Sequence, residues 1–137
     1  MRLKEKVAIV TGAANGIGAE ISRTFAREGC HVVLADLAAE QAAALAAEIT
    51  HSTGIKAISA CCNVAEKGDL QCVVDACVAE FGTVDILVNN AGITLPACPV
   101  EDISPERWLQ VLGIDLMGAI YGTQCVIPVM KAHRSGK

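Results

Sequence analysis

Aromatic residues are scarce in this sequence, at 3% of its 137 residues, whereas hydrophobic residues make up 53%. Any core of this chain therefore has to be built from Ala, Val, Ile and Leu, a composition that suits helices packed on a buried parallel sheet. The length has room for one domain.

A concentration of positive charge is also missing. Lys and Arg number 11 against 15 Asp and Glu, so the formal net charge is −4, and no basic cluster appears. Nucleic acid and an anionic membrane surface are therefore not expected as partners. The N-terminus lacks the apolar core of a signal peptide, and no uninterrupted apolar run reaches membrane-spanning length. These observations predict a cytoplasmic protein without a membrane span.

Metal-ligand and disulfide patterns are absent, although the chain has seven cysteines. No two of them are spaced as C-x2-C, their number is odd, and the three histidines have no ligand-like spacing. We therefore expect neither a metal site nor a disulfide framework. The cysteines are interpreted as small buried hydrophobic residues in a reducing compartment.

A glycine-rich stretch near the N-terminus, residues 7–18, carries the strongest pattern. Four apolar residues lead into three glycines spaced G-x3-G-x-G, and a helix-like pattern follows. Gly12 would permit a sharp turn, Gly16 would let the backbone approach a ligand, and Gly18 would let the helix pack closely on the strand. The helix start would present free N–H groups and its positive dipole end to an anion, which favours the pyrophosphate of a dinucleotide.

This stretch allows two other interpretations. A glycine-rich turn after a buried strand is common without any ligand. The phosphate loop of nucleoside triphosphatases needs a lysine directly after its last glycine, but here Ala19 follows and the next lysine is Lys56. The second alternative is therefore disfavoured.

An acidic residue follows at the expected end of the second strand. Asp36 comes 18 residues after the last of the three glycines, beyond a helix predicted over about 16–28 and an apolar strand over 31–35. A carboxylate there can accept hydrogen bonds from both hydroxyls of the adenosine ribose and repels a 2′-phosphate, which favours NAD over NADP. Neither Asn15 nor Leu37 supplies a positive charge for that phosphate. The alternative is that Asp36 caps the following helix.

The same alternation of strand and helix patterns continues along the chain. Helices are predicted over 38–50 and 69–81, and strands over 55–60 and 84–88. Because such crossovers are right-handed and their strands parallel, we predict an α/β fold. It is a Rossmann-type doubly wound parallel sheet, incomplete, with four strands in the order 3-2-1-4 and helices on both faces. The fourth strand would be an open edge.

The last third of the chain contains a loop and a long helical pattern. The loop over 93–103, with Pro96 and Pro99, is expected to be irregular and to face the substrate side. Ser104 as N-cap and Pro105 at the first helical position predict a helix start, and a proline near position 128 should bend the helix close to its end.

Two stretches together resemble the short-chain dehydrogenase/reductase family: Thr-Gly-Ala-Ala-Asn-Gly-Ile-Gly at 11–18 and Asp-Ile-Leu-Val-Asn-Asn-Ala-Gly at 85–92. The resemblance extends over the whole chain and implies an NAD(P)-dependent oxidoreductase. Such an enzyme transfers hydride to or from a secondary alcohol or ketone and is a homo-oligomer when complete. The resemblance also implies that Asn63 and Val64 contact the adenine and that Asn90 and Gly92 line the ribose and nicotinamide side. The full set of predicted cofactor-binding residues is Gly12, Asn15, Gly16, Ile17, Asp36, Asn63, Val64, Asn90 and Gly92.

The chain departs from the family pattern in two places. Asp115 stands where the family has an Asn at a break in the long helix, and an ionised carboxylate can accept a hydrogen bond but cannot donate one; the alternative is an ordinary solvated helix residue. The family's catalytic Ser, Tyr and Lys follow a fifth strand, which should begin near Lys137. The only tyrosine here, Tyr121, has Cys125 where a Tyr-x3-Lys pair needs lysine.

Residues 1–137 are therefore predicted to form an NAD(P)-binding Rossmann domain truncated before the catalytic Tyr/Lys segment, with catalytic residues unknown. The alternative is a catalytically inactive nucleotide-binding or interaction fragment. Nothing in the sequence selects a particular substrate.

Overall fold

The fold was described from a computed structural model that covers residues 1–95 and 97–137; Pro96 of the predicted loop lies outside the described residues. Four parallel strands form one sheet in the order β3-β2-β1-β4. They are β1 (Val7–Thr11), β2 (His31–Asp36), β3 (Ala57–Cys61) and β4 (Ile86–Val88). The apolar runs of β1 and β2 lie in the middle and are almost entirely buried, as expected for parallel strands covered on both faces. The predicted strand order is confirmed.

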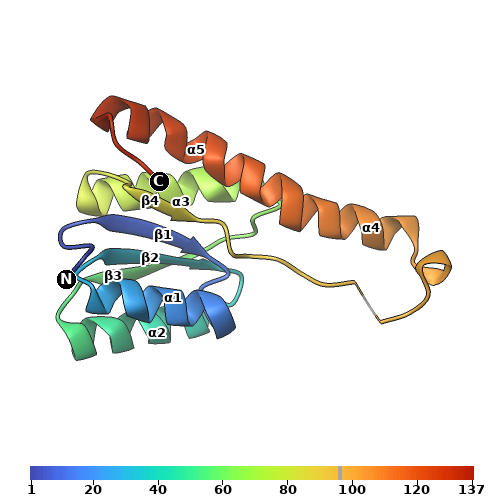
Figure 1. The fold of residues 1–137 in the computed structure, drawn as a ribbon, viewed down its shortest axis with the longest axis horizontal. Coiled ribbons are helices and arrows are strands. Elements are labelled where there is room, and N and C mark those ends of the chain that lie inside the picture. The colour runs from blue at the N-terminus through green and yellow to red at the C-terminus, as the bar shows by residue number, and fades with distance from the viewer. Residues whose placement is uncertain (96) are drawn as a thin grey trace.

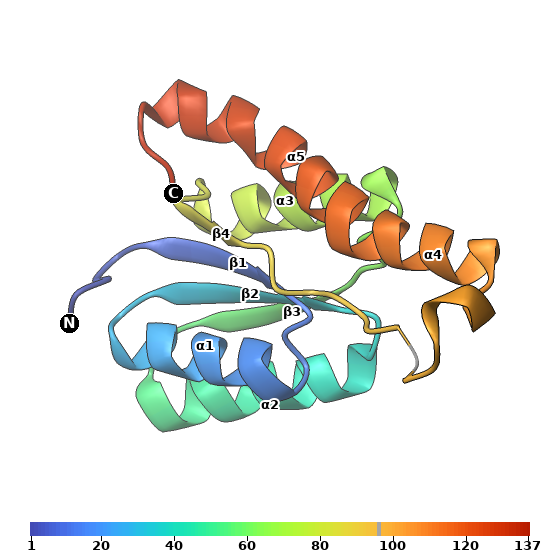
Figure 2. The same cartoon turned by 45° about the vertical axis from the view of Figure 1, so that its right-hand side comes forward.

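Helices cover both faces of the sheet (Figures 1 and 2). One face carries α1 (Gly16–Arg27) and α2 (Ala39–Thr53), and the other carries α3 (Lys67–Phe81) and α5 (Gly118–His133). The structure therefore confirms the predicted Rossmann-type α/β fold.

The end of α2 differs from the prediction. The helix continues to Thr53 instead of ending at residue 50, because Gly54 is the first residue with a left-handed backbone, at φ 72°. The hydroxyl of Thr53 bonds back to the Ile49 carbonyl at 2.7 Å, within the last turn. The following strand accordingly begins at Ala57 and not at Ile55.

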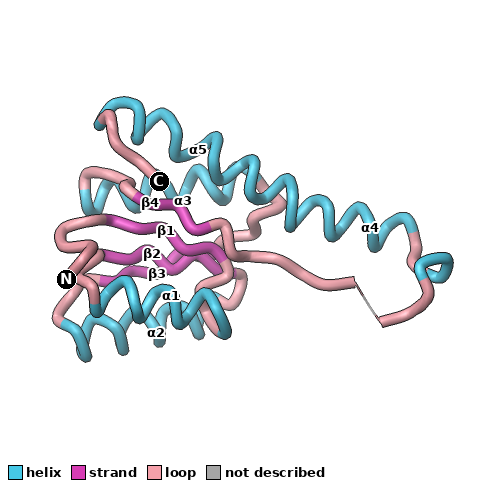
Figure 3. The backbone as a smooth tube through the Cα atoms, in the orientation of Figure 1, coloured by secondary structure: helices cyan, strands magenta, loops and turns pink. Residues whose placement is uncertain are grey.

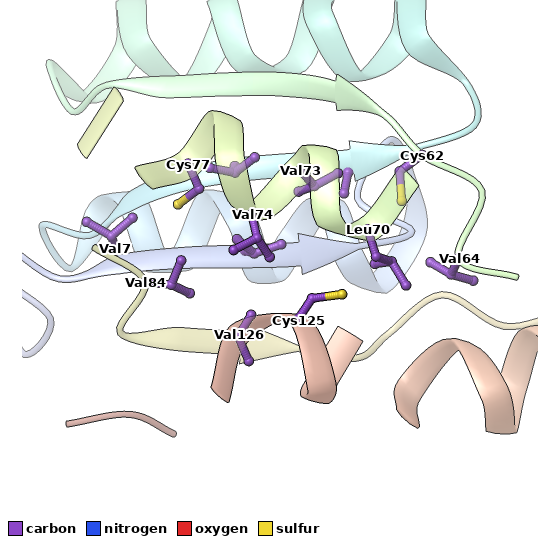
Figure 4. Close-up of a cluster of buried hydrophobic side chains, with 13 residues drawn as sticks. Val7, Cys62, Val64, Leu70, Val73, Val74, Cys77, Val84, Cys125 and Val126 are labelled. Atoms are coloured by element: carbon purple, nitrogen blue, oxygen red, sulfur yellow. The ribbon is translucent and has the colours of Figure 1, made fainter. Parts of the chain in front are cut away.

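The core has two halves, one on each side of the sheet, both built of Ala, Val, Ile, Leu and Cys. Figure 4 shows the half under α3 and α5, where Val74 of α3 lies between Val73 of the same helix and Val126 of α5 in the view. The prediction that the cysteines are buried holds for only four of the seven. The exposed ones lie at the end of β3, on the outer side of α3 and in the loop before α4 (Pro105–Val111), namely Cys61, Cys72 and Cys98.

A long helical stretch closes the described chain. It consists of α4, a π-helical turn η2 (Leu112–Met117) and α5. The predicted start is confirmed, because the Ser104 hydroxyl accepts the Arg107 N–H at 3.3 Å and Pro105 takes the first helical position. The loop before it contains a 3-10 turn, η1 (Val100–Asp102).

This stretch has two different faces. By length and composition alone, residues 105–133 form a helix apolar enough to cross a membrane, although no uninterrupted apolar run in it is that long. Only 22% of its most apolar 18 residues are buried. The inner face of α5 packs on α3 and the sheet through Cys125 and Val126. The outer face exposes large apolar side chains, namely Leu109, Leu112, Leu116, Ile120 and Ile127.

The last residue of the chain partly covers the outer edge of β4. Figure 3 shows the C-terminus close to this edge. The Lys137 N–H donates to the Asp85 carbonyl, and the Leu87 N–H donates to the Lys137 carbonyl, each at 3.0 Å. These are the two bonds that a neighbouring parallel strand would make. The edge that the sequence predicted to be open therefore has a partner at this point.

Candidate functional site

A pocket of about 340 Å³ lies at the carboxyl ends of the strands, where the chain order reverses between β1 and β4. This position is where ligands bind in doubly wound sheets. Eight of the nine residues predicted to bind a cofactor line it: Gly12, Asn15, Ile17, Asp36, Asn63, Val64, Asn90 and Gly92. Within the described residues Gly16 is not part of this lining, which also includes Gly18, Leu37, Cys62, Ala91, Ile93 and Ile114.

The glycine-rich loop forms one side of the pocket. Gly16 has a φ of 53°, a backbone conformation that favours glycine, and a Cβ built there meets no described atom within 4 Å. A Cβ at Gly18 would collide with the carbonyl oxygen of Gly12 and lie 2.6 Å from the side-chain nitrogen of Asn90. The chain therefore leaves open space beside Gly16 and permits only glycine at Gly18.

The start of α1 adds a favourable field for an anion. Its N-cap, Asn15, makes no side-chain capping hydrogen bond in the described structure, and its first turn contains no acidic residue. The first N–H groups of a helix have no partner within the helix, and the positive end of the helix dipole adds to their effect. Ile17, 75% exposed, lies at this end of the pocket.

Asp36 is the last residue of β2, and its carboxylate contacts the glycine-rich loop. Its Oδ2 accepts the N–H of Ala14 at 2.9 Å, and its Oδ1 accepts the N–H of Ala38 at 2.9 Å. Helix α2 begins at Ala39, so Asp36 binds the N–H of the residue directly before the helix, which agrees with the alternative of a cap, and it also links this point to the glycine-rich loop. Each carboxylate oxygen keeps further acceptor capacity toward the pocket.

Asn63 and Val64 follow β3 and reach the same pocket. The Asn63 Oδ1 accepts the Ala65 N–H at 3.1 Å, and its backbone N–H donates to Asp69 at 2.9 Å. The first bond is an Asx turn, which fixes the direction of the side chain. Val64 is 7% exposed and packs against Gly118 of α5, where a Cβ would come 2.9 Å from its Cγ2.

The ends of β1 and β4 are joined by a side-chain network that sequence reasoning did not assign to the site. Thr11, which is 2% exposed, donates to the Val88 carbonyl at 3.2 Å and accepts the N–H groups of Asn90 and Ala91 at 3.0 and 3.1 Å. The Asn90 side-chain amide donates to the carbonyls of Thr11 and Gly12 at 2.9 and 3.0 Å. Both N–H groups of the Asn90 side-chain amide are therefore bound to the protein. The available signal for Thr11 was a polar residue in an otherwise apolar strand.

Asn89 points away from this network. Its side-chain amide lies 3.5 Å from the Thr123 hydroxyl, and its Oδ1 would be 2.9 Å from a Cβ at Gly122 of α5. Helix α5 therefore lies against the pocket lining through Val64, and it contacts Asn89 beside that lining.

The inner end of the pocket is attached to the long helical stretch. Asp115, in the π-helical turn, accepts the Ile93 N–H at 2.9 Å, and Arg107 of α4 donates to the Thr94 carbonyl at 2.9 Å. Asp115 is thus a contact to the loop and not only a solvated helix residue. Gly92 lies beside the same carboxylate, because a Cβ at this position would be 3.4 Å from the Asp115 Oδ1.

The thiol of Cys62 is one of the titratable side chains that line the pocket. Burial raises the pKa of the Cys62 thiol to about 12, so it stays protonated at neutral pH. Tyr121 and Cys125 lie on α5 and join the core under that helix. Among residues 1–95 and 97–137, no three His, Cys, Asp or Glu side chains gather as metal ligands would.

Comparison with known proteins gives this geometry a context. The sequence profile described as short chain dehydrogenase matches residues 6–137. The chain is 45% identical over 125 residues to D-threitol dehydrogenase of Mycolicibacterium smegmatis, covering 91% of this chain and 47% of that protein. It is 38% identical over 136 residues to a 3-oxoacyl-(acyl-carrier-protein) reductase of Thermotoga maritima, covering 99% of this chain and 54% of that protein.

A solved structure is similar over nearly the whole described fold. The 3-ketoacyl-(acyl-carrier-protein) reductase of Brucella melitensis, complexed with NADH, superposes with a TM-score of 0.90 at 34% identity, over 96% of this chain and 52% of that one. The chain spans about half the length of the relatives it matches. It belongs to the short chain dehydrogenase family.

Proposed function

We propose that this chain binds NAD(H) in the pocket at the carboxyl ends of the strands and forms the cofactor-binding part of an oxidoreductase. The observation that carries the proposal is that the start of α1 and the Asp36 carboxylate border one pocket. One of these groups favours a diphosphate and the other favours a ribose with free hydroxyls. The NADH in the similar Brucella melitensis structure supports the same ligand class.

Six of the nine predicted residues have a role that their surroundings allow. The N–H groups near Ile17 would hold the pyrophosphate, and Asp36 would accept the adenosine ribose hydroxyls through its remaining lone pairs. Asn63 and Val64 would border the adenine, and Asn90 and Gly92 the nicotinamide side. The bound cofactor supplies the hydride chemistry, and the protein orients it.

We propose NAD over NADP as the preferred cofactor. A 2′-phosphate would bring negative charge to the Asp36 carboxylate, so NADH should bind at least about tenfold more tightly than NADPH. Titration of both nucleotides, followed by quenching of protein fluorescence or by calorimetry, measures the ratio. Equal or tighter NADPH binding would refute the role of Asp36.

A variant at Gly16 tests the proposal that the glycine-rich loop binds the pyrophosphate. Gly16→Val adds a side chain in the open space beside the pocket and imposes a backbone strain on the loop. We expect NADH affinity to fall strongly in a variant whose circular dichroism shows a folded chain. Unchanged affinity in that folded variant would contradict the pyrophosphate assignment.

We propose that the complete protein moves hydride between the nicotinamide and a secondary alcohol or ketone. The relatives are named as dehydrogenases and reductases of different small molecules, so the proposal stops at this substrate class. A positioned proton donor contributes roughly 10²–10⁴ in rate, and we propose that the Tyr and Lys of the family lie beyond Lys137. A transcript that encodes Tyr-x3-Lys downstream supports this proposal.

A second function is favoured by one observation: the position four residues after Tyr121, where a Tyr-x3-Lys pair needs lysine, holds Cys125. A chain without the Tyr/Lys pair would act as a nucleotide-binding or interaction protein. A stop codon directly after Lys137, together with NADH binding but no turnover of ketones, would support this alternative.

We propose further that the complete protein is a cytoplasmic homo-oligomer with no nucleic acid or membrane partner. The exposed apolar face of the long helical stretch supports a protein contact there. The net charge of −4 argues against a polyanionic partner, and the thiols of residues 1–95 and 97–137, all free, suit a reducing compartment.

A further inference from the structure

We propose that Asp36 is also a positioning residue, which holds the glycine-rich loop in place through the N–H of Ala14. This inference rests on the proposed NAD(H) function, because it assigns a second role to the residue that would select the ribose. The supporting contact is the 2.9 Å hydrogen bond from the Ala14 N–H to Oδ2, which joins residues 22 positions apart. The other oxygen accepts the N–H of Ala38 at 2.9 Å, so the carboxylate is fixed at both ends.

The loop needs such a brace at this point. Ala14 lies between Gly12 and Gly16, which both adopt positive φ and have the largest backbone freedom of any residue type. The neighbouring Ala13 N–H reaches the Ala35 carbonyl at 3.4 Å, a longer bond to the same strand β2. An ionised acceptor makes a stronger hydrogen bond than a neutral carbonyl, so Asp36 supplies the firmer of these two connections between the loop and β2.

The two roles share one set of lone pairs. An ionised carboxylate offers about four acceptor sites, of which the protein uses two and the ribose hydroxyls would use the others. Removal of the carboxylate would relieve the repulsion of a 2′-phosphate, but it would also release the loop that holds the pyrophosphate. Because NAD and NADP share that pyrophosphate, loss of Asp36 weakens the binding of both.

A pair of truncated ligands separates the two roles. ADP and 2′,3′-dideoxyadenosine diphosphate both carry the diphosphate, but the second lacks the hydroxyls that Asp36 would bind. The test compares Asp36→Ala with Glu40→Ala, which removes one exposed negative charge from the first turn of α2. In Asp36→Ala we expect the affinity for the dideoxy ligand to fall by about three- to tenfold, the effect of one hydrogen bond, and Glu40→Ala to leave it unchanged. A dideoxy affinity that stays equal or rises in Asp36→Ala would overturn the proposal.

Amide hydrogen exchange without any nucleotide provides a second measurement. In Asp36→Ala the Ala14 amide should exchange about tenfold faster, while amides within β1 keep their rates. If Asp36→Ala does not fold, Asp36→Asn serves instead, because its single side-chain oxygen can satisfy only one of the two N–H groups, and either Ala14 or Ala38 should exchange faster. Unchanged exchange at both amides would also overturn the proposal. Failure of the wild-type chain to bind ADP or NADH would refute the proposed function, while the exchange rates would still report on the brace.

Discussion

Replacing Thr11 by valine would change one hydroxyl into a methyl group at the carboxyl end of the central strand, with almost no change in shape. The hydroxyl donates to the Val88 carbonyl and accepts the N–H groups of Asn90 and Ala91. Thr11→Val therefore leaves one carbonyl and two N–H groups without this partner. Thr11 itself is only 2% exposed. The ends of β1 and β4 would lose the three bonds of the Thr11 hydroxyl and would keep those of the Asn90 side-chain amide.

The expected magnitude follows from these three groups. A hydrogen bond contributes about 0.5–1.5 kcal/mol net, and a buried group left without a partner costs about 1–3 kcal/mol. Because the network is only partly buried and water can satisfy some of its groups, we expect the free energy of unfolding to fall by about 2–4 kcal/mol. For a domain of this size the melting temperature should fall by roughly 6–15 °C.

Urea unfolding followed by circular dichroism would measure the change, with an unaltered m value as the sign that the transition is the same. The matched control is Thr11→Ser, which keeps the hydroxyl and removes one buried methyl group, at a cost of about 1 kcal/mol. If Thr11→Ser proved more destabilising than Thr11→Val, packing and not the hydrogen-bond network would hold this end of the sheet. That result would refute the reasoning.

Four further predictions rest on the described residues. Gly18→Ala should abolish measurable NADH binding and lower stability by more than about 2 kcal/mol, because its Cβ collides with the Gly12 carbonyl; titration and urea unfolding check this. A thiol reagent at pH 8 should react quickly with the three exposed cysteines and slowly with the four buried ones, and with all seven after unfolding. Burial raises the pKa of Cys30, Cys62 and Cys77 to about 12 from an ordinary 9.0, so the folded chain keeps protons that the unfolded chain releases, and the free energy of unfolding should fall as pH rises above 9.0. Leu116→Lys should shift the complete protein toward monomers in light scattering, whereas Ala44→Lys on α2 should not; unchanged assembly would count against the exposed apolar face as the contact.

The features that could be predicted from the sequence are those with a local signal. The Ser104-Pro105 pair announces a helix start within two residues, and the glycines after a buried strand announce a turn that leads into a helix. Asp36 was placed at the pocket by its distance along the chain from those glycines. Each of these inferences needs only the order of residues along the chain and the periodicity of successive elements.

The features that were missed depend on partners far apart in the chain. Thr11 looks like an ordinary strand residue until it meets groups 77 to 80 positions away. The link from Asp36 to Ala14 likewise appears only when β2 lies beside β1. The exposure of Cys61 and Cys72 depends on which side of a strand end or helix faces water, and residue type alone does not show this.

Helix α5 stands between two regions that the chain keeps separate. Its inner side packs Gly118 against Val64, which lines the pocket, and Gly122 against Asn89, while its outer side exposes Ile120 and Ile127. A close-packed interior transmits a displacement instead of absorbing it. A subunit docked on the outer side of α5 and a nucleotide bound in the pocket would therefore act on the same helix. Linkage makes such an influence mutual. In an assembled protein it would register as NADH binding curves that change shape with protein concentration.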